Sequence, residues 1–481
     1  MSFFKEIVDK LDTDVDDFRK RPKIGVFTLV MINIAAIIGL RNLPLIAMYG
    51  SKAVFMVLLS AFIFFIPVAL VSAELATGWP KEDGGIFIWA KEAYSPRFGF
   101  LSIWLQWIQN VIWFPAELAF AAGTLAYVFN SELASNKLYI LVVIIIAFAF
   151  CIGINLFGLK TSGLISSAGA IIAIFIPFII ILIFCAIWLF KGNPSQISFS
   201  EDLISWEFFD LTNMVLLVGV FLGMAGLEMS AVFANKVRNP QRDYPIAILF
   251  SGIIIIAILM LGSLAIAVVI PQKDLSLVAG VMQAFEVFLG SVNLKWLIPV
   301  LAIMIFIGPI VRVSTWVAGP NEGLLEAAED GYMPSEFKRT NKHGMPVSLF
   351  FLQGVVYAFC LAPFIFMPNI NSSFWLLTAL SAQLYLIMYI FLFSSAIVLR
   401  YRKPDVKRSF RIRGGNFGMW IVAGIGLLAS LFGIFIGFLP PSQIDMGSYS
   451  NYLLFLFIGI FLFCAAPFIM YHFSKAKEAP K

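Results

Sequence analysis

Histidine and cysteine are scarce in this sequence, which holds two histidines and four cysteines. His343 and His472 have no metal-ligand spacing around them, and the four cysteines all lie inside hydrophobic stretches. Membrane enzymes commonly place clusters of His, Asp or Glu at the bilayer surface for metal or acid–base chemistry. The sequence has no such cluster, so we predict neither an enzyme nor a bound cofactor.

Charged residues are also few: they make up 13% of the chain, against 60% hydrophobic residues and a mean hydropathy of +0.93. This composition excludes an ordinary soluble globular protein and indicates a polytopic membrane protein that sits in the lipid bilayer. The net charge of +5 does not indicate nucleic-acid binding, because the basic residues fall almost entirely between the hydrophobic segments. Residues 1–23 lack the apolar core and cleavage site of a signal peptide, so we expect a cytoplasmic N-terminal segment there.

Long hydrophobic runs are abundant, and runs of about 20 apolar residues are typical of transmembrane helices. We expect an all-α protein with twelve spans, near residues 24–49, 53–76, 98–129, 138–157, 163–190, 212–234, 246–270, 296–325, 346–367, 374–399, 417–439 and 452–473.

Lysine and arginine are distributed unevenly between the loops that connect these spans. With both termini placed inside, the inner segments hold 26 of the 33 Lys and Arg residues, the outer loops hold five, and two lie within spans. This asymmetry agrees with the positive-inside rule. It predicts a multi-pass protein whose N-terminus and tail, residues 474–481, are both cytoplasmic.

Arg41 lies in the middle of the first span, between Gly39 and Pro44. An arginine near the bilayer centre costs roughly 2.5–3.5 kcal/mol, so such residues usually face a protein interior or a water-filled cavity. Glycine adds backbone freedom and proline removes a donor, so we expect a broken helix here. Unpaired backbone groups at this depth are tolerated only where they are buried or line a cavity. We therefore predict that this stretch is half of a substrate site.

A second interruption is expected five spans later, at residues 219–228 of the sixth span, where three glycines fall within a short stretch. Two interrupted helices at corresponding positions of two halves indicate an inverted-repeat transporter with its site at the bilayer midplane. The expected halves are residues 24–190 and 212–399, and residues 417–473 lie outside the repeat. This inference depends on position alone, because no repeat is visible as residue identity.

Several motifs resemble those of one known family. They are Trp79-Pro80-Lys81-Glu82-Asp83-Gly84-Gly85-Ile86-Phe87, Gly226-Leu227-Glu228, Asn239-Pro240-Gln241-Arg242-Asp243-Tyr244-Pro245, Val269-Ile270-Pro271, Ala279-Gly280-Val281-Met282-Gln283 and Asn341-Lys342-His343-Gly344-Met345-Pro346-Val347. The first two resemble amino acid–polyamine–organocation (APC) permeases, and the others resemble the bacterial glutamate/γ-aminobutyrate antiporter branch. The resemblance implies a LeuT-like, five-plus-five inverted-repeat fold in the bacterial inner membrane that exchanges amino acids or their decarboxylated products.

The sequence also departs from that branch. Arg41 and Asn42 stand in the first break, where the acid-resistance antiporters have aromatic and acidic residues, and Arg312 stands in the eighth span, where an acidic residue is expected. Residues 474–481 are much shorter than the cytoplasmic tail that is associated with closing those antiporters at neutral pH. Substrate and pH dependence therefore do not carry over from the resemblance.

Arg41 and Arg312 are the strongest candidates for substrate binding. In the fold that the resemblance implies, their spans line the central cavity, where two guanidinium groups could clamp a carboxylate. The positive end of a half-helix would add to this attraction. The alternative is that each arginine pairs with a carboxylate inside the membrane, Glu117 or Glu228, and only holds the helices together.

The other candidates supply backbone groups, aromatic rings and hydroxyls. Groups at the two breaks could hold the α-carboxylate and α-amino groups of an amino acid, although close helix packing explains the glycines equally well: Ile38, Gly39, Asn42, Gly223, Met224 and Ala225. Tyr385 and Tyr389, four residues apart, share one helix face, and Trp316 is a weaker candidate. Ser314 and Thr315 could coordinate sodium, and Glu228 could tie helices together or titrate.

We therefore expect a secondary exchanger of acidic amino acids, with glutamate and γ-aminobutyrate as the first candidates. Exchange of arginine for agmatine, or symport coupled to protons or sodium, is an alternative. Some proton-driven relatives have a lysine in span 5, but residues 163–170 have none, so exchange is favoured. A non-transporting sensor and a membrane enzyme are remote alternatives. The expected partners are amino acids and lipid, and the chain is expected to be a monomer or homodimer.

Overall fold

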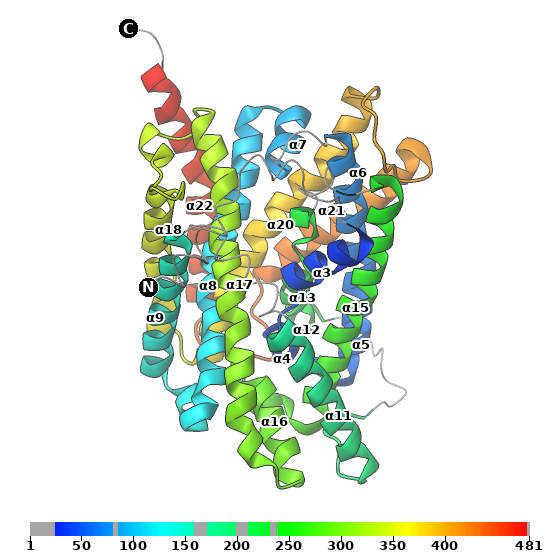
Figure 1. Cartoon of the computed structure of the whole chain (residues 1–481), viewed down its shortest axis with the longest axis vertical. Coiled ribbons are helices and arrows are strands. Elements are labelled where there is room, and N and C mark those ends of the chain that lie inside the picture. Colours follow the sequence, from blue (N-terminus) through cyan, green and yellow to red (C-terminus); the bar gives the residue numbers. More distant parts are fainter. Residues whose placement is uncertain are drawn as a thin grey trace, which may run out of the picture.

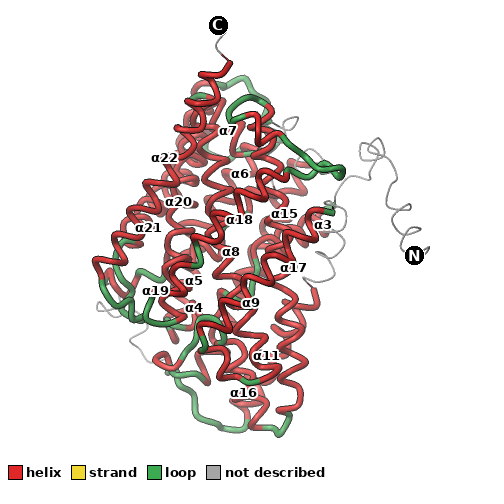
Figure 2. Tube along the Cα trace, turned by 90° about the vertical axis from the view of Figure 1, so that its left-hand side faces the viewer, coloured by secondary structure: helices red, strands yellow, loops and turns green. Residues whose placement is uncertain are grey.

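The computed structural model describes residues 25–79, 85–157, 171–198, 210–230, 237 and 239–478. In this part of the chain Figure 2 shows helices and loops and no strand, which confirms the all-α prediction. The expected N-terminal segment, most of the motif at 79–87 and the stretch 163–170 lie outside the described residues.

The long helices run side by side along the long axis of the molecule (Figures 1 and 2). In chain order the α-helices of the described part are α3 (Val26–Ile37), α4 (Asn42–Ala47), α5 (Ala53–Ser60), α6 (Ile66–Gly78), α7 (Ile86–Ala93), α8 (Pro96–Phe129), α9 (Lys137–Leu156), α11 (Ile176–Phe190), α12 (Leu211–Met214), α13 (Leu217–Met224), α14 (Leu227–Ser230), α15 (Pro240–Val269), α16 (Gly280–Ser291), α17 (Ile298–Glu329), α18 (Val347–Phe359), α19 (Ala362–Phe366), α20 (Ile370–Arg402), α21 (Gly415–Gly437) and α22 (Tyr449–Glu478). In both views α7 lies near the end from which the C-terminus projects, and α16 lies at the opposite end.

Eleven helices of the described part are long and apolar enough to cross a membrane. They correspond to the second to twelfth predicted runs, beginning with Gly50–Gly78 and ending with Tyr449–Ser474. The Gly50–Gly78 helix contains one π-helical turn, η2 (Ala61–Phe65), between α5 and α6. The chain is therefore a multi-pass helical protein.

The first predicted run contains two shorter helices in place of one continuous helix. Helix α3 ends at Ile37, Ile38 is extended (φ −71°, ψ 128°), and α4 begins at Asn42. Pro44 lies inside the first turn of α4, where a backbone N–H has no intrahelical acceptor and its loss costs nothing. The first run is therefore broken around Gly39, as predicted, and Pro44 fits this break because its ring would clash with the carbonyl of Leu40 in an uninterrupted helix.

A second interruption separates α13 from α14. Ala225 is extended, with ψ 155°. Gly226 has a φ of +116°, a backbone conformation that residues with a Cβ rarely adopt. Gly226 therefore permits the change of direction between the two helices. Both interruptions lie among buried residues, where their backbone groups are protected from lipid.

Helix α8 is the centre of the molecule and packs against α17 and α20. Of the 18 residues in its most apolar stretch, 89% are buried inside the protein, whereas the corresponding share for α22 is 17%. Polar side chains on α8 must therefore find their partners within the protein.

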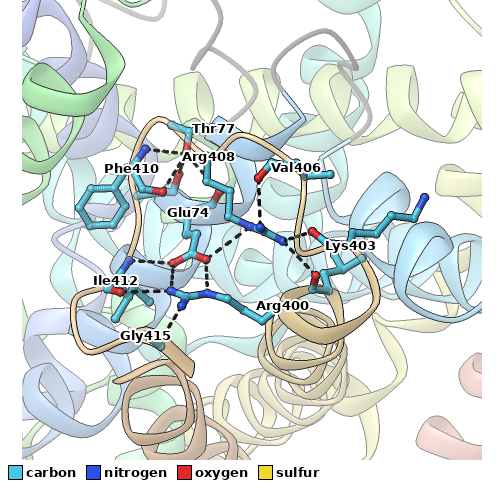
Figure 3. Close-up of polar contacts among 11 residues, drawn as sticks. Glu74, Thr77, Arg400, Lys403, Val406, Arg408, Phe410, Ile412 and Gly415 are labelled. Atoms are coloured by element: carbon cyan, nitrogen blue, oxygen red, sulfur yellow. Dashed lines mark hydrogen bonds and ion pairs between the residues drawn. The ribbon is translucent and has the colours of Figure 1, made fainter. Parts of the chain in front are cut away.

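A buried cluster, which we call the Glu74 clamp, ties α6 to α20 and to the loop that precedes α21 (Figure 3). The Glu74 carboxylate accepts hydrogen bonds from Arg400 Nε (2.6 Å), Arg400 Nη2 (2.7 Å) and the backbone N–H of Ile412 (2.8 Å). Arg400 Nη1 donates to the Gly415 carbonyl, and Arg408 Nε lies 3.5 Å from Glu74 Oε1. Hydrogen bonds thus occupy both charged groups of the Glu74–Arg400 pair, although each is only 1% exposed.

Candidate substrate site

Arg41 lies at the first break, directly before α4, and its side chain is only 3% exposed. Its Nη2 donates a 2.8 Å hydrogen bond to Thr378 Oγ1, and its Nη1 lies 3.6 Å from Glu117 Oε2. The Cζ atom lies 4.7 Å from the centroid of the Phe374 ring and 5.5 Å from that of Trp113, within the range of cation–π attraction. Helices α8 and α20 therefore position this guanidinium from two sides.

Arg312 reaches the same carboxylate from α17. Its Nη1 lies 3.5 Å from Glu117 Oε1, and its Cζ lies 5.0 Å from the centroid of the Trp113 ring. The guanidinium also fills the space beside Gly39, because a Cβ added to Gly39 would overlap Arg312 Nη1. A glycine at the break is thus what admits the second arginine.

The arginine cluster, which we define as Arg41, Glu117 and Arg312, is unbalanced in charge. It contains two guanidinium groups and one carboxylate, which leaves one excess positive charge, since an arginine stays protonated in proteins. Four of its buried atoms have no hydrogen-bond partner among the described residues: Arg41 Nε, Arg312 Nε, Arg312 Nη1 and Glu117 Oε2. Buried polar groups are nearly always paired, so this cluster has the capacity to bind a further polar group.

A cavity of about 10 Å³ adjoins the cluster, which is room for about one water molecule. It is lined by Gly39, Leu40, Glu117, Phe120, Ala173, Ile174, Ile305, Gly308, Pro309 and Arg312. This volume is too small for an amino acid. The helices are thus closely packed around the charged groups of the cluster.

Glu228 forms a second polar cluster in α14. Tyr389 Oη donates to Glu228 Oε2 at 2.6 Å, Tyr385 Oη donates to Oε1, and Gln106 Nε2 lies 3.4 Å from Oε1. The Tyr389 hydroxyl also accepts a 3.0 Å hydrogen bond from the Gly226 N–H at the second break. Both tyrosines lie on one face of α20, as predicted, and Glu228 pairs with them, whereas both arginines contact Glu117.

Comparison with known proteins decides the family. The family model described as amino acid permease matches residues 24–463. The chain belongs to the amino acid permease family. It is therefore a transporter and not an enzyme, as predicted.

Individual relatives of this permease cover nearly its whole length. It is 43% identical to an uncharacterized transporter of Legionella pneumophila over 446 residues, 93% of this chain and 96% of the relative. It is 35% identical to a glutamate/γ-aminobutyrate antiporter of Lactococcus lactis subsp. lactis, over 93% of this chain and 90% of that protein. A protein of the same organism named as a probable agmatine/putrescine antiporter is 26% identical, over 82% of this chain and 84% of its own length.

Asn42 and Trp316 lie at the two breaks of this permease. A Cβ added to Gly223 would lie 3.0 Å from Asn42 Nδ2, so the amide packs directly on α13. A Cβ added to Gly226 would lie 3.7 Å from Trp316 Cζ2, which brings the indole to the second break. The remaining break residues, Ile38, Met224 and Ala225, are buried.

The hydroxyls of α17 have protein partners. Asn155 Nδ2 donates to Ser314 Oγ at 3.0 Å, and Thr315 Oγ1 donates to the Val311 carbonyl at 2.9 Å. A hydrogen bond to the carbonyl four residues earlier, as at Thr315, is a common role of hydroxyls in membrane helices. A sodium site at Ser314 and Thr315 stays a prediction.

Several residues around the two clusters were missed by the sequence analysis. Thr378 and Phe374 hold Arg41, and a row of side chains along α8 follows the 3–4 spacing of one helix face. The row consists of Gln106, Gln109, Asn110 and Trp113, and it leads to Glu117, which the sequence analysis had named as a partner of the arginines. Its signal was available in the sequence, because polar residues at that spacing in a membrane helix indicate a polar protein interior.

Gly39 gives a test of the site geometry. Replacing Gly39 with alanine should push the Arg312 guanidinium out of place, because the added Cβ would occupy its position, and should reduce substrate affinity about tenfold or more. The fold should survive, since the overlapping atom is the far end of a flexible side chain. Uptake into proteoliposomes and the melting temperature measure the two effects. Gly153→Ala in α9, where nothing lies within 4 Å, is the matched control and should change neither. Normal affinity in Gly39→Ala would contradict the placement of Arg312.

Proposed function

We propose that this permease is a secondary exchanger of acidic amino acids, with glutamate and γ-aminobutyrate as the first candidate pair. The observation that carries the proposal is the convergence of Arg41 and Arg312 on one carboxylate, with one positive charge left over. A carboxylate of the substrate would balance that charge and use the unpaired guanidinium donors. The name of the relative that is 35% identical supports the same substrates.

The proposed architecture is a twelve-span, five-plus-five inverted repeat. The α3–α4 pair would be the first span, and the eleven long apolar helices would be the others. The two interruptions, α3–α4 and α13–α14, then fall in the first and sixth spans, at corresponding positions of the two halves. Each substrate would cross by alternating access, as the broken helices rock against a scaffold of spans 3–5 and 8–10. The distribution of Lys and Arg supports cytoplasmic termini, and the bacterial origin of the relatives supports a place in a bacterial cell (inner) membrane.

The two polar clusters would hold opposite ends of the substrate. The arginine cluster attracts a carboxylate, and Glu228 with Tyr385 and Tyr389 attracts an ammonium group. Along α20, Thr378 and Tyr385 are seven residues apart, which corresponds to roughly 10 Å of helix rise. Glutamate and γ-aminobutyrate both carry an ammonium group and a carboxylate separated by several bonds, so they suit such a divided site.

A cationic exchange pair such as arginine and agmatine is the second candidate, because one relative is named for agmatine and putrescine. The excess positive charge of the arginine cluster opposes it, since a cation brought to this position would be repelled. The same transport experiment separates the two candidates.

Counterflow in proteoliposomes tests the function. Vesicles loaded with unlabelled glutamate should take up labelled glutamate and γ-aminobutyrate, and vesicles without internal substrate should take up neither. Arginine-loaded vesicles should fail to take up labelled arginine or agmatine. Exchange of arginine for agmatine without exchange of glutamate would overturn the proposed substrates, and uptake that does not depend on internal amino acid would overturn exchange itself.

A further inference from the structure

We propose that Glu117 is an internal counter-ion that the substrate carboxylate displaces from the two arginines. This inference rests on the proposed function, in which the arginines hold a carboxylate of the substrate. In the empty protein Glu117 would hold the two guanidinium groups in place. When substrate enters, its carboxylate takes over their donors and Glu117 gives them up.

The geometry of the Glu117 contacts shows that they are loose. The described part of the chain contains two buried carboxylates that each face two arginines, and the two arrangements differ. In the Glu74 clamp the Arg400 nitrogens lie 2.6 and 2.7 Å from the carboxylate oxygens in a bidentate pair (Figure 3). The second arginine of the clamp, Arg408, lies 3.5 Å from Glu74. At Glu117 both arginines lie that far away, at 3.5 and 3.6 Å, and neither contact is a hydrogen bond. The clamp is thus built to persist, whereas the Glu117 contacts are easily exchanged.

The buried atoms of the cluster that lack a hydrogen-bond partner indicate which kind of group it could still bind. Glu117 is 1% exposed, yet its Oε2 has no hydrogen-bond partner among the described residues. The Nε atoms of Arg41 and Arg312 have no such partner either. A second carboxylate would accept hydrogen bonds from donors that Glu117 leaves unused. Residues that line the adjoining cavity include Glu117, Arg312 and Gly39, so the cavity lies beside the contact that must open.

Displacement makes Glu117 a competitor of the substrate. A like charge next to the binding site lowers the affinity for an anion, and a nearby opposite charge raises it. With Glu117 in place, the cluster offers one positive charge to the substrate in place of two. Glu117 would therefore weaken substrate binding, which is the opposite of what a residue with a purely structural role would do.

Four proteins with different cluster charges test this inference. The wild type has one excess positive charge, Arg312→Gln has none, Glu117→Gln has two, and the Glu117→Gln/Arg312→Gln double variant again has one. We expect substrate affinity to rise with the excess positive charge of the cluster. Relative to the wild type, binding should be about tenfold or more tighter in Glu117→Gln and about tenfold or more weaker in Arg312→Gln. The double variant should regain most of the affinity that Arg312→Gln loses, because the two changes act on one cluster.

Binding of labelled glutamate to the purified full-length protein in detergent measures the four affinities. The control is Glu132→Gln, which removes an exposed carboxylate outside the site and should bind like the wild type. Equal or weaker binding by Glu117→Gln, or a double variant no better than Arg312→Gln, would overturn the counter-ion role. If Glu117→Gln does not fold, the comparison of the double variant with Arg312→Gln decides alone. Failure of the proposed function would show separately, as a wild-type protein that binds no acidic amino acid.

Discussion

Replacing Arg41 with alanine should abolish the binding of acidic amino acids, weakening it by at least about 100-fold. Arg41 contributes one of the two positive charges of the arginine cluster and is fixed by Thr378 and by the Phe374 ring. Without it, Arg312 and Glu117 form a neutral pair, and no positive charge is left for the substrate. The same neutrality means that the variant should fold, because no buried charge loses its only partner. Binding and counterflow of labelled glutamate by the purified variant measure the effect.

Two further variants show whether the loss of binding is specific to the Arg41 guanidinium. Arg41→Lys keeps the charge but not the planar fork of donors, so it should retain part of the binding. Arg97→Ala removes an exposed arginine that stacks on Tyr471, outside the site, and should bind like the wild type. If Arg41→Ala binds glutamate with unchanged affinity, Arg41 only holds helices together and the proposed substrates lose their support.

Replacing Glu74 with glutamine should lower the free energy of unfolding by about 3–5 kcal/mol, the effect of breaking one side of a buried ion pair. Arg400 is 1% exposed and would keep its charge without the carboxylate that balances it. The backbone N–H of Ile412 would also lose a charged acceptor, and the loop before α21 would lose its attachment to α6. Heating the detergent-solubilised protein and following the monodisperse fraction measures the loss.

Glu92→Gln is the matched control for the Glu74 clamp. Glu92 pairs with Lys403 at 2.7 Å, but the two side chains are 30% and 46% exposed. An ion pair at the surface contributes about 0–1 kcal/mol, so this variant should melt close to the wild type. If both variants melted alike, the clamp would contribute no more to stability than a surface contact.

The sequence predicts the parts of the site that depend on local features of the chain, namely the free-energy cost of a charge in lipid and the spacing of residues along a helix. An arginine in the middle of an apolar run must avoid lipid, so Arg41 and Arg312 could be singled out, and the structure buries Arg41 and brings both to Glu117. The four-residue spacing of Tyr385 and Tyr389 likewise places them on one face, where both bond Glu228. Which of two carboxylates the arginines contact could not be predicted, because it depends on how α8 and α14 are rotated in the assembled bundle.

The Glu74 clamp was missed for a related reason. Glu74 and Arg400 are 326 residues apart in the chain, and each lies near the end of a hydrophobic run, where charged residues need no special explanation. Only the folded chain brings them together. The sequence predicts a break near Gly39 and Pro44, but it does not show that α4 begins at Asn42 and leaves Pro44 in its first turn, because the exact helix ends depend on the surrounding packing.

The π-helical turn at Ala61–Phe65 determines which way Glu74 faces. A π-bulge holds about one residue more than the α-helical turn that it replaces, so every later side chain is turned by about 100° around the axis. Glu74 lies two to three turns beyond this bulge on the same continuous helix. In an uninterrupted α-helix its carboxylate would therefore be directed about a quarter-turn away from Arg400. One surplus residue near the middle of the Gly50–Gly78 helix thus sets the angular register of an ion pair near its end.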